Sequence, residues 1–150
     1  MTTIQLPIDH QDFLRLLTSH GVEYLVIGGI ATVFHGYPRF TADLDVWVAA
    51  ERDNVEKLVE ALHAFGFSRQ SLAVERFLEP NQVFRMGVDP LRIELFTGIP
   101  GVMFADFFPR RVTTEINGIP VNFIGLADHR LNKQAAGRPK DLADLEELPK

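Results

Sequence analysis

The chain has 150 residues, a length that suits one domain built around one hydrophobic core. Hydrophobic residues make up 46% and charged residues 23% of the sequence, a globular balance that excludes a disordered composition. The formal net charge of -5 argues against a broad nucleic-acid-binding surface, and the absence of cysteine excludes disulfides, thiolate metal sites and cysteine nucleophiles.

Two features of the sequence bear on location. The N-terminal residues lack the charged start and the apolar stretch of a secretory signal. The longest apolar stretch, over 24–34, contains two glycines and is shorter than the ~20 residues that span a bilayer. We therefore expect a cytoplasmic protein with no membrane segment.

Hydrophobic periodicity in the first half of the chain predicts helices that alternate with buried strands. The expected elements are a helix over 10–19, a strand over 24–27, a helix over 30–35, a strand over 41–48 and a helix over 55–65. Asp53 is available as a cap for the last of these helices, and Gly66 is a typical stop for it.

The second half of the chain predicts two hairpins followed by two helices. We expect a short helix over 71–79, strands over 82–87, 91–97, 112–115 and 121–124, and helices over 126–136 and 139–148. Asp89-Pro90 and Asn117-Gly118 have the chemistry of the two hairpin turns. The expected fold class is α+β, a mixed sheet flanked by helices, in a single domain over 1–150.

A pair of acids stands in the predicted strand over 41–48. Strand alternation puts Asp43 and Asp45 on one face and the apolar residues between them on the other. Two neighbouring carboxylates repel each other unless a cation lies between them, and Mg²⁺ or Mn²⁺ would fill that place. The alternative is a solvent-exposed strand face with two incidental acids.

Two further features give the acid pair a context. Gly28-Gly29 lies where a strand gives way to a helix, so that backbone amides can approach a phosphate closely; a tight turn in a crowded core is the alternative. Glu94 stands between Ile93 and Leu95 in the predicted strand over 91–97 and can project from the same sheet surface as the aspartates.

In this order, Gly28-Gly29, Asp43-x-Asp45 and Glu94 resemble the DNA polymerase β superfamily of nucleotidyltransferases. Arg39 and Thr41 also stand where small prokaryotic members often carry arginine and threonine. The resemblance implies that Asp43 and Asp45 bridge two divalent ions and that Glu94 completes the acceptor-side site. It further implies transfer of a nucleotidyl group from a nucleoside triphosphate (NTP) to a hydroxyl, with release of pyrophosphate.

The C-terminal segment over 133–144 resembles abortive-infection (AbiEii-type) toxin nucleotidyltransferases. The resemblance implies that Lys133 contacts the triphosphate and that Asp141 lies near the site, with Arg138 and Lys140 as further candidates. A solvated helical face with alternating charges is the alternative. The sequence departs from the pattern in two respects. Its third acid is Glu94 where relatives often have aspartate, and we expect no separate acceptor-binding domain after the catalytic core.

Three hypotheses on function follow. The first is an active transferase, as a toxin with a cognate antitoxin or as a resistance enzyme, that modifies a tRNA end, a protein hydroxyl or a small molecule. The second is a non-catalytic nucleotide-binding or antitoxin-like module, and the third is an interaction domain with incidental acids. Trp47 could stack on a base or belong to the core, and the phenylalanines around Phe104 suggest core or a homodimer contact.

Overall fold

A computed structural model describes residues 4–88, 92–100 and 102–150 of the chain. In these ranges six strands form one mixed sheet in the order β3-β4-β2-β1-β6-β5. The strands are β1 (Tyr24–Ile27), β2 (Leu44–Val48), β3 (Val83–Met86), β4 (Ile93–Phe96), β5 (Val112–Ile116) and β6 (Ile119–Phe123). The predicted α+β fold class is confirmed.

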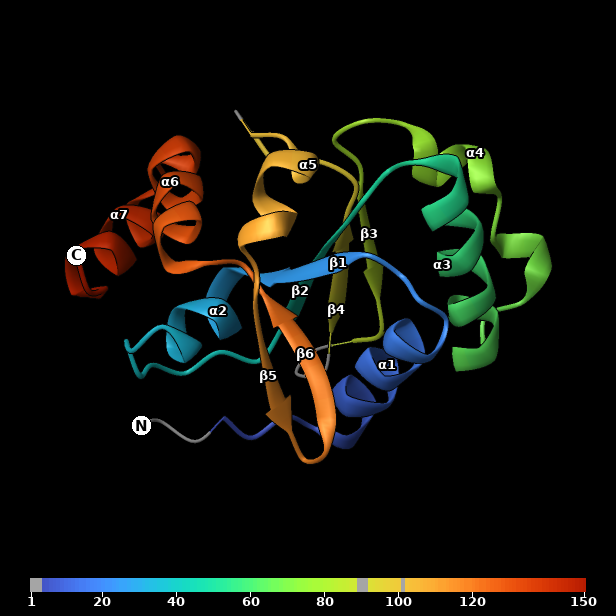
Figure 1. Ribbon diagram of the computed structural model, residues 1–150, viewed down its shortest axis with the longest axis horizontal. Helices are drawn as coiled ribbons and strands as arrows, with labels where there is room; N and C mark the ends of the chain where they lie inside the picture. The colour runs from blue at the N-terminus through green and yellow to red at the C-terminus, as the bar shows by residue number, and fades with distance from the viewer. Residues whose placement is uncertain (1–3, 89–91, 101) are drawn as a thin grey trace.

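Helices cover the sheet from several sides (Figure 1). They are α1 (Ile8–Ser19), α2 (Gly28–Phe34), α3 (Arg52–Phe65), α4 (Val74–Leu78), α5 (Phe104–Phe107), α6 (Leu126–Ala136) and α7 (Pro139–Glu147), with short 3-10 helices η1 (Arg69–Ser71) and η2 (Phe108–Arg110). In Figure 1, α1, α3 and α4 lie to the right of the sheet, and α2, α6 and α7 gather to the left. None of the helices in the described ranges has the length and apolarity to cross a membrane.

The strand pairing brings the sequence motifs together. β2 pairs antiparallel with β1, so that Asp45 lies opposite Ile27, the last residue before the glycine pair. On its other side β2 pairs parallel with β4, which places Asp45 opposite Glu94. Motifs 17 and 49 residues from Asp45 along the chain therefore meet at one position of the sheet.

The core lies on both faces of the central strands. Leu44, Val46 and Val48 are fully buried on one face of β2. On the other face Trp47 is 1% exposed and packs edge-on against Phe104 and Phe107 of α5, with ring centroids 5.1 and 5.9 Å away. Trp47 is thus a core residue, and stacking on a nucleotide base is excluded while it keeps this place.

Some predicted boundaries are wrong, and strand pairing explains the most important one. The strand predicted over 41–48 begins at Leu44, because β1 ends at Ile27, opposite Asp45, and β4 begins at Ile93, opposite Leu44. Asp43 therefore precedes the strand. The helix predicted over 30–35 begins earlier, so that Gly28 and Gly29 form its first turn.

Other differences are local. Asp53 lies in the first turn of α3 and makes no capping hydrogen bond, since Glu51 holds the N-cap position. The helix predicted over 71–79 divides into η1 and α4, and the short α5 and η2 were not predicted because one turn carries no helical periodicity. The Asn117-Gly118 turn is confirmed by φ angles of 52° and 80°, whereas the Asp89-Pro90 turn lies outside the described residues.

Candidate nucleotide site

The centre of the candidate site is a contact between backbone and carboxylate. Gly28 has a φ of 69°, a conformation that favours glycine. It also stands so close to Asp45 that a Cβ atom at position 28 would overlap the carboxylate. Glycine is required here both for the backbone angle and for the approach of the two groups.

The next glycine is covered by the loop that leads into β2. A Cβ atom at Gly29 would overlap the Thr41 hydroxyl and would lie 3.3 Å from Nη2 of Arg39. The loop thus folds its arginine and threonine over the first turn of α2. The glycine pair, Arg39, Thr41 and Asp45, which the sequence predicted as one site, lie together.

The surroundings of Asp45 disfavour its ionised form. Burial is the main cause that raises the pKa of Asp45 to about 7, and the charges of Glu94 and Asp43 add to it. Lys140 and Lys133 act in the opposite direction. A cation close to Asp45 would therefore stabilise its ionised form.

Glu94 lies beside Asp45 with two arginines around it. Its side chain is 17% exposed, and its Oε1 is 3.8 Å from Nε of Arg85 and 4.0 Å from Nη1 of Arg92. Arg85 stands opposite Glu94 on the edge strand β3. A row of charged side chains thus crosses the sheet from Arg85 through Glu94 to Asp45.

The chemistry of these carboxylates fits a hard divalent cation. Carboxylate oxygens are the ligands that Mg²⁺ prefers. Burial, and after it the charges of Glu94 and Asp43, raise the pKa of Asp45, and a bound cation would oppose both effects. Within the described ranges, no three histidine, aspartate or glutamate side chains form a ready group for one metal ion. The fit therefore concerns only the chemistry of the donor atoms, which the carboxylates of Asp43, Asp45 and Glu94 supply.

The C-terminal helices bring a buried network of ions to the same region. Nζ of Lys133 is 3.2 Å from Oδ1 of Asp141 and 2.9 Å from Oδ2 of Asp144. Asp144 in turn accepts two hydrogen bonds from Arg39, at 2.9 and 3.0 Å. Asp141 accepts two from the guanidinium of Arg138, at 2.7 and 3.3 Å, and one from its backbone N–H at 3.2 Å. The network ties α6 and α7 to the loop before β2.

Asp144 is the residue in this network whose role the sequence did not single out. Burial opposes its ionisation, but the hydrogen bonds from Arg39 and Lys133 outweigh burial and lower its pKa. Asp144 is therefore a buried anion with two cationic partners. Its position three residues after Asp141, on the same face of α7, is the signal that could have identified it.

A cavity of about 660 Å³ opens over the acids, a size typical of small-molecule sites. Its lining includes Gly29, Arg39, Thr41, Asp43, Asp45, Lys140 and Asp144. Other predicted site residues, namely Gly28, Glu94, Lys133, Arg138 and Asp141, stand outside this lining. Lys140 is thus the lysine at the cavity wall, whereas the Lys133 side chain, 6% exposed, is held between two aspartates.

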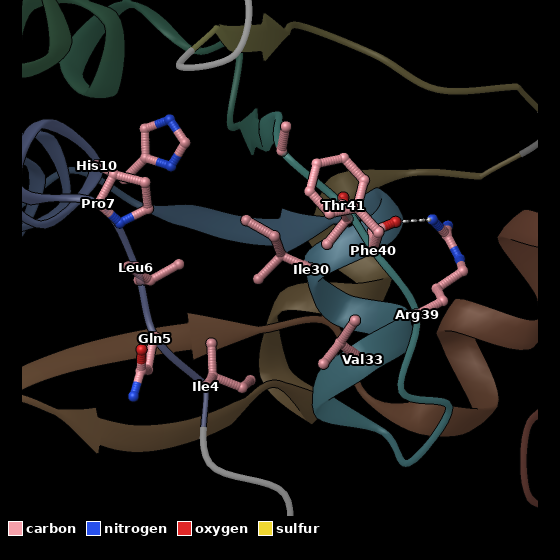
Figure 2. Close-up of a pocket in the computed structure, with 11 residues that line it drawn as sticks. Ile4, Gln5, Leu6, Pro7, His10, Ile30, Val33, Arg39, Phe40 and Thr41 are labelled. Carbon is pink, nitrogen blue, oxygen red and sulfur yellow. Dashed lines mark hydrogen bonds between the residues drawn. The ribbon is translucent and has the colours of Figure 1, made fainter.

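A second cavity of about 390 Å³ shares lining residues of the loop before β2 with the first. Figure 2 shows its apolar walls, which come from the segment over 4–7 and from Ile30 and Val33 of α2. Arg39 and Thr41 line both cavities. The loop is therefore the partition between a charged and an apolar cavity.

The class of protein, a nucleotidyltransferase, is given by the family to which the chain belongs. The chain belongs to the family described as nucleotidyl transferase of unknown function (DUF2204), which matches residues 9–150. No curated protein matches the chain.

Two solved structures share the fold. A candidate nucleotidyltransferase from Thermotoga maritima has a TM-score of 0.60 and 13% identity, over 91% of this chain and 88% of that one. The lincosamide antibiotic adenylyltransferase LnuA, bound to lincomycin, has a TM-score of 0.56 and 14% identity, over 96% of this chain and 97% of its own. At these identities the likeness establishes the fold.

We expect Asp45→Asn to stabilise the protein in a pH-dependent way. The pKa of Asp45 is raised in the folded state, so folding binds a proton and stability falls as pH rises from the unfolded pKa of about 4 toward 7. The gain in the free energy of unfolding should be larger at pH 8 than at pH 5 by up to about 3 kcal/mol. Urea unfolding in the absence of metal measures this free energy at both pH values, and Asp53→Asn is the control. An equal gain at pH 5 and pH 8 would contradict the raised pKa of Asp45.

The second prediction concerns the buried network. Asp144→Ala leaves Lys133 and Arg39 without a shared carboxylate, and removal of one partner from a buried ion pair costs about 3–5 kcal/mol of stability. Glu147→Ala, an exposed change on the same helix, should cost little. Urea unfolding of both variants tests this, and a loss below about 1 kcal/mol for Asp144→Ala would refute the structural weight given to the network.

Proposed function

We propose that the cavity over Asp43 and Asp45 binds a nucleoside triphosphate and transfers its nucleotidyl group to a hydroxyl acceptor. The observation that carries the proposal is the approach of the Gly28 backbone to Asp45, beside the loop of Arg39 and Thr41. Membership of a nucleotidyl transferase family supports it. A minimal site of this kind would be contained in the one domain that residues 1–150 are proposed to form.

The residues of the chain would divide the work between the two ends of the donor. The first backbone N–H groups of α2 have no partner within the helix and suit phosphate oxygens, which glycine lets approach closely. Arg39 and Lys140, at the cavity wall, supply positive charge for the triphosphate. Lys133 contributes to the potential at Asp45 and positions Asp144, which holds Arg39.

The acids would act on the side of the reacting phosphorus. Asp43, Asp45 and Glu94 are the residues that would hold Mg²⁺ or Mn²⁺, which when bound supplies activation of the acceptor hydroxyl and neutralises charge on the leaving group. The acceptor oxygen forms a bond to the α-phosphorus as the bond to the pyrophosphate oxygen breaks. Glu94, which lies between Arg85 and Asp45 in the charged row, would take the hydroxyl proton.

Three classes of acceptor fit the proposal, namely an RNA end such as that of tRNA, a protein hydroxyl and a small molecule. The lincosamide adenylyltransferase has this fold over 97% of its chain and is bound to lincomycin, so the fold is compatible with a small-molecule acceptor. The segment over 133–144 supports the AbiEii-type alternative, a toxin held by a cognate antitoxin. A homodimer stays a prediction for this protein.

Label transfer tests the proposed reaction. The protein is incubated with Mg²⁺, each of four NTPs labelled at the α-phosphate, and an acceptor set of total RNA, total protein and hydroxyl-bearing antibiotics. We expect label on one acceptor class with the wild type, and loss of at least about 100-fold in rate with Asp43→Asn and Asp45→Asn, because the metal ligands are removed. Asp53→Asn is the control, and unchanged transfer in both site variants would refute the mechanism.

A further inference from the structure

A buried hydrogen-bonded chain joins α6 to the glycine pair at the start of α2. Nε2 of His129 lies 2.8 Å from the hydroxyl of Thr32, and both residues have no exposed surface. The Thr32 hydroxyl donates to the carbonyl oxygen of Gly28 at 3.2 Å. The chain therefore ends on the residue whose backbone meets Asp45.

The two contacts determine which nitrogen of His129 carries the proton. A hydroxyl has one hydrogen to donate, and in this chain Thr32 donates it to Gly28. Nε2 of His129 must then be the donor to Thr32, which leaves Nδ1 without a proton. Nδ1 is buried and has no hydrogen-bond partner among the described residues. Burial lowers the pKa of His129 to about 3, so the ring is neutral at physiological pH.

The same face of α6 also supports the cationic wall of the cavity. Lys133 stands one turn after His129 and holds Asp144, which accepts two hydrogen bonds from Arg39. Figure 1 shows α2, α6 and α7 gathered at one end of the molecule. One helix therefore touches both sides of the site, the Gly28 turn through His129 and the Arg39 side chain through Lys133.

We propose that His129 is a positioning residue of the nucleotide site, which acts through Thr32 to hold the Gly28 backbone against Asp45. The inference rests on the proposed function. Packing alone does not account for the pair, because an apolar residue would fill either position without the cost of burying polar groups. A directed hydrogen-bonded chain fixes an orientation that apolar contacts leave free.

His35 lies near this chain but takes no part in it. Its ring centroid is 5.9 Å from that of His129, and its Nε2 is 2.6 Å from the carbonyl oxygen of Ile124. The contact fixes His35 to the end of β6 rather than to the glycine turn. His129 and Thr32 are therefore the two residues to vary.

The test compares nucleotide affinity in variants of two buried threonines. Thr32→Val keeps the shape and removes the hydroxyl, and Thr32→Ser keeps the hydroxyl. Thr97→Val is the matched control, because Thr97 is also buried and its hydroxyl also has two hydrogen-bond partners. It accepts from the N–H of Gln82 and donates to the carbonyl oxygen of Glu79, away from the site. The readouts are the melting temperature and the Kd for each of ATP, GTP, CTP and UTP with Mg²⁺, measured by calorimetric titration.

We expect Thr32→Val to weaken binding of the preferred NTP about tenfold and Thr32→Ser to restore it. Thr97→Val should lower the melting temperature without a change in Kd. His129→Ala should weaken binding like Thr32→Val, and His129→Gln, which retains a donor, should recover part of the loss. An unchanged Kd in Thr32→Val, or equal weakening in Thr97→Val, would overturn the role of His129.

Two outcomes separate this inference from the proposed function. Wild-type protein that binds none of the four NTPs would overturn both, whereas tight wild-type binding that Thr32→Val leaves intact would overturn the inference alone. Nitrogen-15 NMR of the wild-type protein reports which ring nitrogen of each histidine carries the proton, and it does not depend on a variant that folds. We expect His129 to carry its proton on Nε2, and a proton on Nδ1 would contradict the hydrogen-bonded chain.

Discussion

The approach of the Gly28 backbone to the Asp45 carboxylate is the contact on which the rest of the site depends. Antiparallel pairing of β1 with β2 brings Ile27 opposite Asp45, and the helix that begins at the next residue must then pass directly beside an acid. Any side chain at position 28 would occupy the space of the carboxylate. In the proposed reaction, the backbone at Gly28 would bind phosphate oxygens of the triphosphate, and Asp45 would lie beside the phosphorus that reacts.

Charge balance around this contact explains the remaining architecture. Burial and two neighbouring acids disfavour ionisation of Asp45, so the protein surrounds it with cations at some distance, including Lys133 and Lys140. Lys133 is itself held by two buried aspartates on α7, Asp141 and Asp144. In the proposed mechanism these charges are in place before a cation and a triphosphate bind, so that binding would need no reorganisation of them.

The sequence predicted the elements well where a local pattern determines them. The strand Tyr24–Ile27 and the helix Leu126–Ala136 have the predicted bounds, and the hairpin at Asn117-Gly118 has the predicted turn. The predicted start of β2 was wrong, because the true start depends on the partner strands and not on the local sequence. Elements of a single turn, such as α5, were absent from the prediction, since they carry no periodicity.

For the site, local motifs predicted which residues meet but not how they are held. One stretch of 18 residues contains the glycine pair, Arg39, Thr41 and the Asp43-x-Asp45 motif, and these residues lie together where α2 begins. The burial of Lys133 between two aspartates depends on how α6 packs on α7, which no local pattern encodes. The chain from His129 to Thr32 spans 97 residues and could be found only in the structure.

Nucleotide titration of Gly28→Ala against Gly118→Ala tests the central claim most directly. Both glycines have a positive φ, 69° and 80°, so alanine strains the backbone in either place, but only at Gly28 would the added Cβ meet the Asp45 carboxylate. The account predicts that Gly118→Ala binds Mg²⁺ and the preferred NTP with the wild-type Kd, whereas folded Gly28→Ala loses binding. Wild-type affinity in a folded Gly28→Ala protein would contradict it.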